Sequence, residues 1–517
     1  MTDFSPAPGT FRGPLHDLAL AESTSPDRRL LAWRDGELSV ARFAAAVRSV
    51  ALELRDHGVV AGSRVAVMAA NSHRLLVATY AIWTLGAVEV SVNSELKGPL
   101  LKHVLDDSDP ALLLADDLFI PVVRSVRPDL ETLRLDDLRH DRGTSETFRL
   151  AGDDALASLL YTSGTTGPSK GVMIPHGYYS YFASVLGAAL NLGESDTCYF
   201  TLPFFHVDAH IALPACLRWG SSLAFASRFS VSSFWEDVTH FDASWFGAVG
   251  SMLSALVSRG RPPQRVLDRL RLIVAAPVPQ EAFANFEDAW GVPILQMYGQ
   301  TEANGPLYST LARRRRGAAG WPCAGFDVKV VDDSGVPAPR GQAGELLIRP
   351  SSANALAQGY WRRADATAAA FADGWYRTGD LVRQDEDGFV WYVGRKKDSL
   401  RRRGENISAF ELESVLSAAP GVRTAAALAV RDELGGEDDI KAVLAVAPEF
   451  DLTVFGDYCR SSLPRFAVPR FVEIVDESRI VRGPGTGAIQ KHLLPQGVTG
   501  ATIDLEVTLA IRQKGNQ

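Results

Sequence analysis

The run YTSGTTGPSKGV at residues 161–172 constrains this chain more than any other feature of its sequence. Glycine and hydroxyl residues fill Thr162 to Gly167, and Pro168, Ser169 and Lys170 follow. Small residues let the backbone approach a ligand closely, so that N–H groups and hydroxyls can surround an anion. The apolar stretch ALASLL before the run predicts a strand. The run is therefore expected at the end of a sheet strand, where open α/β sheets bind ligands.

Two other interpretations of the run fit less well. A flexible linker has no need of a single lysine, or of a set TSGTTG order between apolar flanks. A Walker A loop requires GxxxxGK followed by serine or threonine, but Gly167 is followed by Pro168 and Ser169, and Lys170 by Gly171. The run thus predicts an anion-binding loop of a different kind.

Composition restricts the class of protein and its partners. The chain has 517 residues, of which 46% are hydrophobic and 22% charged, so two or more globular domains are expected. The net charge of −8 gives no basic footprint for nucleic acid or an anionic membrane. The four cysteines are widely spaced without a CxxC pair, which predicts reduced thiols and neither a disulfide framework nor a zinc site.

The compartment is predicted from what the sequence lacks. The start MTDFSPAPGTFRG has no apolar region of the signal-peptide type, and no stretch approaches about 18 consecutive apolar residues. A cytoplasmic location is expected. The excess of arginine over lysine and the abundance of alanine favour a bacterial source.

Hydrophobic periodicity predicts two parts of different texture. From residue 38 to about 310, helical and buried-strand patterns alternate, which predicts parallel sheets covered by helices. Short β-type runs separated by Gly/Pro turns predict a small β subdomain over about 320–394. The rest reads as a compact α+β module, and the polar, basic stretch GRKKDSLRRRGEN is typical of a hinge. The expected domains are 1–394 and 395–517.

Four motifs in order resemble one known family. The run at 161–172, QMYGQTE at 296–302, YRTGDLV at 376–382 and GRKKD at 394–398 closely resemble motifs of the adenylate-forming superfamily. Its members are acyl- and aryl-CoA ligases, adenylation domains of peptide synthetases and firefly-type luciferases. They form an acyl-AMP from ATP and a carboxylate, then usually pass the acyl group to a thiol. The resemblance extends from WTLGAVEV to IQKHLL and implies a large N-terminal domain with a mobile C-terminal lid.

The resemblance implies a nucleotide site. Glu302 suits Mg²⁺, which prefers oxygen ligands and takes one or two protein carboxylates. Asp380 can accept hydrogen bonds from both ribose hydroxyls, and Thr301 would contact a phosphate. Tyr298 would stack on the adenine, Arg395 would reach ribose and phosphate, and Tyr392 is a further candidate for the wall. The complete set of cofactor-binding candidates is Thr162, Ser163, Gly164, Thr165, Thr166, Gly167, Lys170, Ala275, Ala276, Pro277, Tyr298, Gly299, Asp380, Tyr392 and Arg395.

The resemblance also implies residues for the acyl group and for domain movement. His206 in LPFFHVDAH would lie near the reacting carboxylate, although a buried structural histidine is the alternative. Lys397 lies where the family has its hinge, and the GEN loop beginning at Gly404 would line the tunnel of coenzyme A. GAVG at 247–250 and the AAP run at 275–277 correspond to pocket walls.

One position departs from the family pattern. The family ends in a TGK[IV]xK signature whose first lysine is catalytic, but here Thr486 and Gly487 are followed by Ala488. Lys491 matches a separate family position. Loss of one preorganised donor to the transition state costs about 10²–10³ in rate. Thioester formation does not use this lysine, so the chain resembles a ligase impaired in its first half-reaction only.

The sequence thus predicts an acyl-CoA ligase-type enzyme that uses ATP or acyl-AMP, Mg²⁺ and coenzyme A. The stretch KDSLRRRGENIS and the tail after IQKHLL resemble the crotonobetaine/carnitine-CoA ligase branch. Two alternatives stay open: an ordinary two-step ligase met as a lysine-to-alanine variant, and a nucleotide-binding pseudoenzyme. A partner adenylating ligase and a homodimer also stay open as partners.

Overall fold

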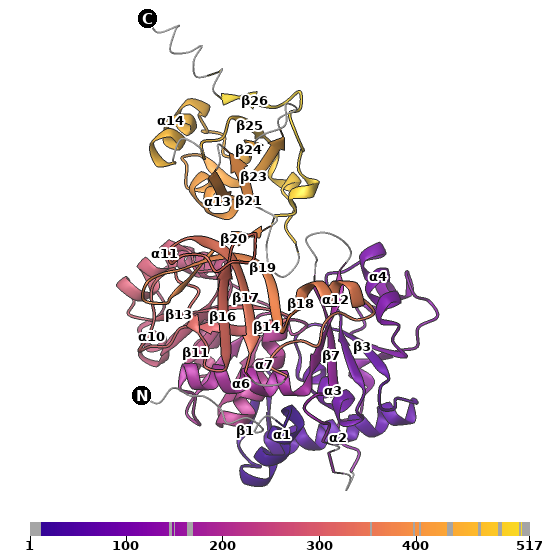
Figure 1. Ribbon diagram of the computed structural model, residues 1–517. Helices are drawn as coiled ribbons and strands as arrows, with labels where there is room; N and C mark the ends of the chain where they lie inside the picture. The colour runs from indigo at the N-terminus through magenta and orange to yellow at the C-terminus, as the bar shows by residue number, and fades with distance from the viewer. Residues whose placement is uncertain are drawn as a thin grey trace, which may run out of the picture. The chain divides into compact units, whose positions relative to one another are not determined.

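The chain divides into two compact units that both mix helices with strands. The computed structural model describes residues 12–143, 147–148, 150–162, 169–351, 354–396, 399–402, 405–431, 438–463, 467–483, 489–505 and 508. Unit 1 takes in Met1–Val328, Leu347–Arg377 and Asp385–Trp391. Unit 2 takes in Lys329–Leu346, Thr378–Gln384 and Tyr392–Gln517. The predicted α/β class, with a large N-terminal and a smaller C-terminal part, is confirmed (Figure 1).

The largest sheet of unit 1 has a parallel centre and antiparallel edges. Its strand order is β15-β14-β13-β12-β11-β9-β10-β1-β2, parallel from β13 to β1. Fully buried four-residue strands such as β9 are what a sheet covered on both faces requires. The strands are β1 (Arg29–Trp33), β2 (Gly36–Ser39), β9 (Thr197–Phe200), β10 (Ser222–Phe225), β11 (Trp245–Ala248), β12 (Leu272–Ala275), β13 (Ile294–Gln300), β14 (Ala303–Tyr308) and β15 (Trp321–Pro322).

A second sheet of unit 1 carries the glycine-rich run. Its order is β6-β5-β3-β4-β7-β8, and all pairings are parallel except the hairpin of β7 with β8. The strands are β3 (Arg64–Met68), β4 (Val88–Ser91), β5 (Leu112–Ala115), β6 (Thr132–Arg134), β7 (Leu156–Thr162) and β8 (Lys170–Pro175). β7 ends at Thr162, so the run begins where a strand stops, as predicted.

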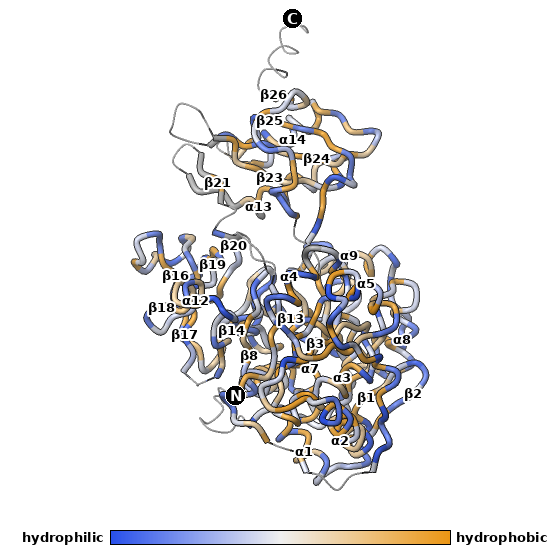
Figure 2. The backbone as a smooth tube through the Cα atoms, turned by 90° about the vertical axis from the view of Figure 1, so that its right-hand side faces the viewer, coloured by the Kyte–Doolittle hydropathy of each residue, from blue (hydrophilic) through white to orange (hydrophobic). Residues whose placement is uncertain are grey.

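Helices fill the space around both sheets. Nearly every residue of α6 is buried, because this helix contacts β8 of one sheet and β14 of the other. Figure 2 shows hydrophobic residues concentrated around α3 and α7. The helices are α1 (Pro14–Thr24), α2 (Val40–Asp56), α3 (His73–Thr84), α4 (Gly98–Ser108), α5 (Ile120–Arg124), η1 (Leu135–Asp137), α6 (His176–Leu190), α7 (Val207–Trp219), α8 (Phe234–His240), α9 (Gly250–Arg259), α10 (Gln264–Arg269), α11 (Gln280–Ala282) and η2 (Phe283–Ala289). Of the helices in the described residues, none has both the length and the apolarity to cross a membrane.

Short strands follow, as the Gly/Pro-punctuated runs predicted. They are β16 (Phe326–Val331), β17 (Ala343–Pro350), β18 (Phe371–Ala372), β19 (Trp375–Gln384) and β20 (Val390–Arg395), with the helix α12 (Ala364–Ala370) among them. The sheet order is β16-β17-β19-β18, with β20 paired to β19. Unit 2 includes parts of this region, so the domain boundary at 394/395 stays a prediction.

The C-terminal module contains the predicted α+β elements. Its sheet has the order β23-β24-β25-β26, with a separate hairpin of β21 and β22. Two hydrophobic clusters form from alternating residues of β23 and β24, because successive side chains of a strand point to opposite faces. The elements are β21 (Ser399–Arg402), β22 (Glu405–Ser408), α13 (Ala409–Ser417), β23 (Val422–Arg431), β24 (Asp438–Val446), α14 (Leu452–Ser462), β25 (Phe471–Ile474), η4 (Glu477–Arg479), η5 (Lys491–Leu493) and β26 (Ile503–Asp504).

Candidate active site

The hairpin of β7 and β8 closes the base of the glycine-rich run. Thr162 lies opposite Lys170 across the two strands. The predicted loop residues Ser163, Gly164, Thr165, Thr166 and Gly167 lie outside the described residues. The Lys170 ammonium is 5.0 Å from the centre of the Tyr360 ring, within the range of a cation–π contact.

Tyr360 joins Lys170 to Glu302. Its hydroxyl donates to Glu302 Oε1 at 2.7 Å, and both side chains are largely buried. The segment around Tyr360 is bonded to β8 like an added strand: Met173 N donates to Gly359 O at 2.9 Å, and Trp361 N to Gly171 O at 2.8 Å. Two predicted site residues that are 132 positions apart therefore meet through a third residue that sequence analysis did not single out. The sequence AQGYW carries no periodic signal that indicates this role.

Thr301 and Glu302 form the turn between β13 and β14. The Tyr178 hydroxyl donates to Thr301 O at 2.9 Å, and Ala357 N donates to Glu302 O at 2.9 Å. Gly299 fits closely here, because a Cβ at this position would lie 3.0 Å from Gly305 N and would need the neighbouring backbone to shift. Tyr298 is 8% exposed in β13. These bonds hold the backbone of the turn, whereas the nucleotide roles assigned to it stay predictions.

The predicted pocket walls lie at the carboxyl ends of adjacent parallel strands. β11 ends at Ala248 within the GAVG stretch, and β12 ends at Ala275, the first residue of the run Ala275, Ala276 and Pro277. Ala275 pairs with Ala248 on one side and with Gln296 of β13 on the other. Open α/β sheets bind ligands at this edge.

His206 directly precedes α7, and the first turn of this helix contacts β14. The Asn304 amide donates to Asp208 Oδ1 at 3.0 Å, which connects the first turn of α7 with β14. His206 Nε2 is buried and has no hydrogen-bond partner among the described residues. Burial is the main cause that lowers the pKa of His206 below its usual value, so its ring is neutral at neutral pH.

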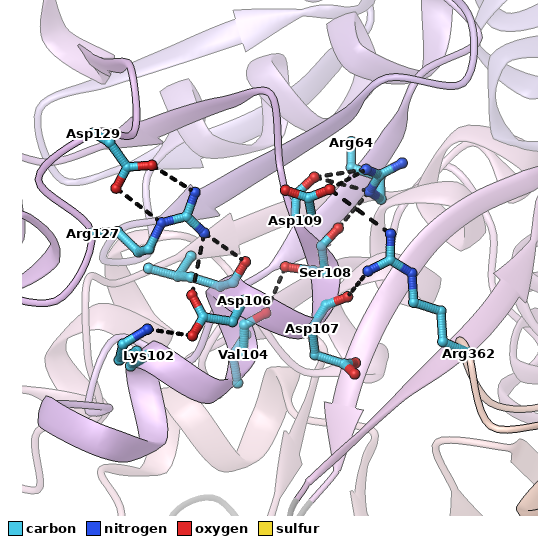
Figure 3. A network of polar contacts seen from close by, with 11 residues as sticks. Arg64, Lys102, Val104, Asp106, Asp107, Ser108, Asp109, Arg127, Asp129 and Arg362 are labelled. Atoms are coloured by element: carbon cyan, nitrogen blue, oxygen red, sulfur yellow. Dashed lines mark hydrogen bonds and ion pairs between the residues drawn. The ribbon is translucent and has the colours of Figure 1, made fainter.

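The end of α4 supports both flanks of the run. Figure 3 shows Arg64, Arg127 and Arg362 converging on the C-terminal end of this helix, where unpaired carbonyls and the helix dipole favour cations. Asp107 Oδ2 accepts from the Tyr161 hydroxyl at 2.7 Å, and Asp107 O accepts from Trp361 Nε1 at 3.1 Å. The residues beside Thr162 and Tyr360 are thus bonded to one helix end.

His103, also on α4, contacts the other end of the run. Its Nε2 lies 2.8 Å from Ser169 O, directly before Lys170. The hydrogen bond sets the backbone at the point where the chain leaves the run. No sequence pattern indicated this contact, because α4 and β8 are remote in sequence.

The remaining predicted residues belong to unit 2 or lie outside the described residues. Asp380 is 2% exposed in β19, and its N–H donates to Thr378 Oγ1 at 3.0 Å. Tyr392 is half-buried in β20, and only the backbone of Arg395 is described. Lys397, Gly404 and Ala488 are among the residues that the structure does not describe.

The base of the segment that carries Ala488 is nevertheless well defined. Arg482 forms an antiparallel bridge with Ile489, and Gln490 N donates to Val481 O at 2.9 Å. Lys491 Nζ lies 3.0 Å from Glu413 Oε1, in a partly buried ion pair. The lysine nearest to Ala488 in sequence is therefore engaged elsewhere.

Comparison with known proteins places the chain in a family. Residues 19–361 match the family "AMP-binding enzyme", and residues 411–482 match "AMP-binding enzyme C-terminal domain". The 2-succinylbenzoate–CoA ligase of Bacillus subtilis (strain 168) is 29% identical over 476 residues, covering 91% of this chain and 95% of that protein. The crotonobetaine/carnitine–CoA ligase of Salmonella choleraesuis (strain SC-B67) is 30% identical over 449 residues, covering 81% and 86% respectively.

Solved structures give the same result. The O-succinylbenzoate coenzyme A synthetase of Bacillus subtilis in complex with AMP matches with a TM-score of 0.85 and 27% identity, covering 94% of this chain and 98% of that one. The same enzyme has been solved with ATP and a magnesium ion, and with its acyl-adenylate intermediate. With two thirds of its length matched by the first family, this chain belongs to the AMP-binding enzymes.

Proposed function

We propose that the chain is an AMP-forming acid–thiol ligase that makes a coenzyme A thioester from a carboxylic acid through an acyl-AMP. We propose further that it is competent in thioester formation and impaired in adenylation. The observation that carries the proposal is the contact series Lys170–Tyr360–Glu302 beside the glycine-rich run. The curated relatives are both CoA ligases, which supports the same reaction class.

The described residues fit a nucleotide and Mg²⁺. Glu302 offers an oxygen of a largely buried carboxylate, the ligand type that Mg²⁺ takes in phosphate chemistry. Lys170 and the run beginning at Thr162 would bind phosphate, and Tyr298 with Ala275 to Pro277 would border the base. Bound Mg²⁺ would neutralise phosphate charge. Tyr360 keeps the Glu302 carboxylate and the Lys170 ammonium in one orientation, which limits the reorganisation needed when phosphate binds.

His206 would meet the reacting acyl group. Its Nε2 is buried without a partner among the described residues, and a buried polar atom normally has a partner, which a bound ligand would supply. A neutral ring can donate one hydrogen bond or accept one, which suits the carbonyl or phosphate oxygen of an acyl-AMP.

Ala488 is the reason for proposing impaired adenylation. Methyl cannot replace an ammonium donor, and Lys491 is paired with Glu413. Arg482 and Ile489, which flank the segment 484–488, form an antiparallel bridge. The expected penalty for adenylation is about 10²–10³ in rate.

The reaction is tested by mass spectrometry of acyl-CoA. The chain is incubated with coenzyme A and synthetic acetyl-, crotonyl- or benzoyl-AMP, and in parallel with each free acid, ATP and Mg²⁺. We expect thioester from at least one adenylate and far less from the corresponding acid. Equal rates from acid and adenylate would identify an ordinary two-step ligase, and binding of AMP without any thioester would identify a pseudoenzyme.

We also propose that Lys397 is the hinge of a C-terminal lid, residues 395–517. Proline fixes φ near −65°, so Lys397→Pro should block the rotation between the two half-reactions. Thioester formation from acyl-AMP is expected to collapse while acyl-AMP affinity, measured by calorimetry, survives. Loss of both quantities, or of neither, contradicts the hinge.

A further inference from the structure

Glu89 is a carboxylate in the interior of unit 1. It lies on β4 opposite Ser158 of β7 and is completely buried. Its Oε1 accepts from the Thr79 hydroxyl at 3.0 Å, and its Oε2 accepts from the Ser158 hydroxyl at 2.8 Å. A buried carboxylate is costly unless it is hydrogen-bonded and paired with a cation. The cation here is a histidine.

His210 of α7 is that cation, and its two ring nitrogens both face acceptors. Nε2 lies 2.8 Å from Glu89 Oε2, and Nδ1 lies 3.1 Å from the backbone oxygen of His206. With Glu89 ionised, neither the carboxylate nor the carbonyl can donate, so the ring donates from both nitrogens as an imidazolium. The ring also stacks on Tyr179, with centroids 5.4 Å apart.

The titration behaviour agrees with this geometry. Burial acts to lower the pKa of His210, but the charge and hydrogen bond of Glu89 outweigh it and raise the pKa above its usual value. Burial acts to raise the pKa of Glu89, but His210 outweighs it and the pKa lies below its usual value. Both shifts favour the charged forms of the two groups.

The pair ends at His206. The His206 carbonyl accepts the second imidazolium bond and also one from Ala209 N at 3.2 Å, so the pair and the first turn of α7 together hold the backbone from which the His206 ring projects. That ring packs 4.5 Å from Phe205, and its Nε2 is buried without a partner among the described residues. An apolar pair would pack this interior at least as stably, so the directional bond is what the charges add.

We infer that Glu89 and His210 are positioning residues for His206, and that their charged hydrogen-bond chain aims the His206 ring at the acyl group of the substrate. The inference rests on the proposed function for its substrate. Burial contributes most to keeping the His206 ring neutral, and the His210 charge adds to it. Asp208 and Glu95 also face His206 and act in the opposite direction.

A double-mutant cycle tests the chain of contacts. Glu89→Gln keeps the shape and the acceptor oxygen but removes the charge, so His210 can no longer donate from both nitrogens. We expect kcat/KM for thioester formation, with the best of acetyl-, crotonyl- and benzoyl-AMP, to fall about 3- to 10-fold, as for one hydrogen bond. AMP affinity should not change. In the His206→Ala background the same change should have less than about 2-fold effect, and an equal loss in both backgrounds overturns the inference.

A second measurement does not depend on activity. In protein labelled with ¹⁵N-histidine, the His210 ring should show two protonated nitrogens at neutral pH. In Glu89→Gln, one of these nitrogens should lose its proton, and the His206 signal should shift. Thr79→Val is the matched control, since it removes one donor to Glu89 and leaves the ion pair, and the His206 signal should stay. A neutral His210, an unmoved His206 signal in Glu89→Gln, or an equal shift in Thr79→Val overturns the inference. Absence of all thioester formation would instead count against the proposed function.

Discussion

A buried ion pair occurs in each unit, and the two pairs hold different kinds of segment. In unit 1, Glu89 and His210 connect β4 with the start of α7, where His206 lies. In unit 2, Lys441 of β24 lies 2.7 Å from Glu473 of β25, with side chains 0% and 5% exposed. Lys441 also donates to Pro495 O and Gly497 O, at 3.0 and 2.8 Å. The Glu89–His210 pair thus contacts the backbone of a predicted site residue, and the Lys441–Glu473 pair contacts the backbone of the C-terminal tail at residues 495–497.

The two pairs share one feature, which is that each contacts backbone carbonyls. His210 and Lys441 each donate to backbone carbonyls just outside a helix or strand, and the His206 carbonyl also accepts from Ala209 N at 3.2 Å. Thr499 and Thr502 complete the second pair by donating to Glu473 at 2.7 and 2.9 Å. The tail that they hold follows the segment 484–488, in which position 488 is alanine.

The largest effect is expected from breaking the pair in unit 2. Lys441→Met leaves Glu473 buried without its cation, which should cost about 3–5 kcal/mol of unfolding free energy in that unit. Hydrogen exchange read by mass spectrometry, resolved to β24 and β25, measures it. Arg423→Met is the control on neighbouring β23, because its pair with Glu477 is exposed on both sides, and it should cost less than about 1 kcal/mol. Equal losses of unfolding free energy in the two variants would show that the buried pair contributes no more than the exposed one.

Ala488→Lys tests whether a lysine at position 488 can act in adenylation. A lysine there should raise adenylation about 10²–10³-fold and leave thioester formation from acyl-AMP nearly unchanged. The assay is ATP–pyrophosphate exchange with an acid whose adenylate the chain accepts. Brisk exchange by the unmodified chain would falsify the impaired first step. Absence of exchange in both chains would mean that the preceding residues VRGPG, at 481–485, keep position 488 from its place.

As the pH falls, unit 1 is expected to lose stability before unit 2. Burial lowers the pKa of His176 to about 4, and burial aided by the Arg74 charge does the same for His73 and His140. A histidine with a lowered folded pKa takes up its proton on unfolding, so stability is lost as the pH falls from 6.5 toward about 4.

Unit 2 is expected to stay folded to lower pH than unit 1. Its Glu473 has a pKa below the usual 4.5, because Lys441 and two threonines outweigh the effect of burial, so its contribution is present above 4.5 and lost only below. All 10 tryptophans lie in unit 1, so their fluorescence reports that unit alone. Hydrogen exchange in β23–β25 reports unit 2. Simultaneous loss of both signals would show that the imidazoles do not control acid stability.

The smallest effect concerns the nucleotide residue predicted within unit 2. Asp380→Ala should weaken AMP binding by about 1.5–3 kcal/mol, since a charged acceptor for two hydroxyls is removed. Calorimetry with AMP measures the change, and Glu386→Ala, an exposed carboxylate of the next turn, is the control. Unchanged affinity would remove Asp380 from the site and leave nucleotide binding to unit 1.

Local sequence patterns predicted the alternation of helices with strands. The helical apolar period of LSVARFAAAVRSVALELRD coincides with α2, the apolar run SRVAVMAAN contains β3, and IKAVLAV lies within β24. These patterns are informative because a helix or strand buries one face according to its own repeat, whatever the rest of the chain does. The motif residues Thr162, Lys170 and Glu302 were likewise found from short ordered strings.

The sequence by itself determined the fold class, the position of the glycine-rich run at a strand end, the family motifs and the alanine at position 488. Only the tertiary structure decided that Tyr360 stands between Lys170 and Glu302, and that Glu89 meets His210 across 121 positions of sequence. The physical reason is that periodicity and small-residue loops act through neighbours in the chain. A buried charge or hydroxyl instead takes its partner from whichever strand or helix the sheet order brings beside it, and no local repeat records that order.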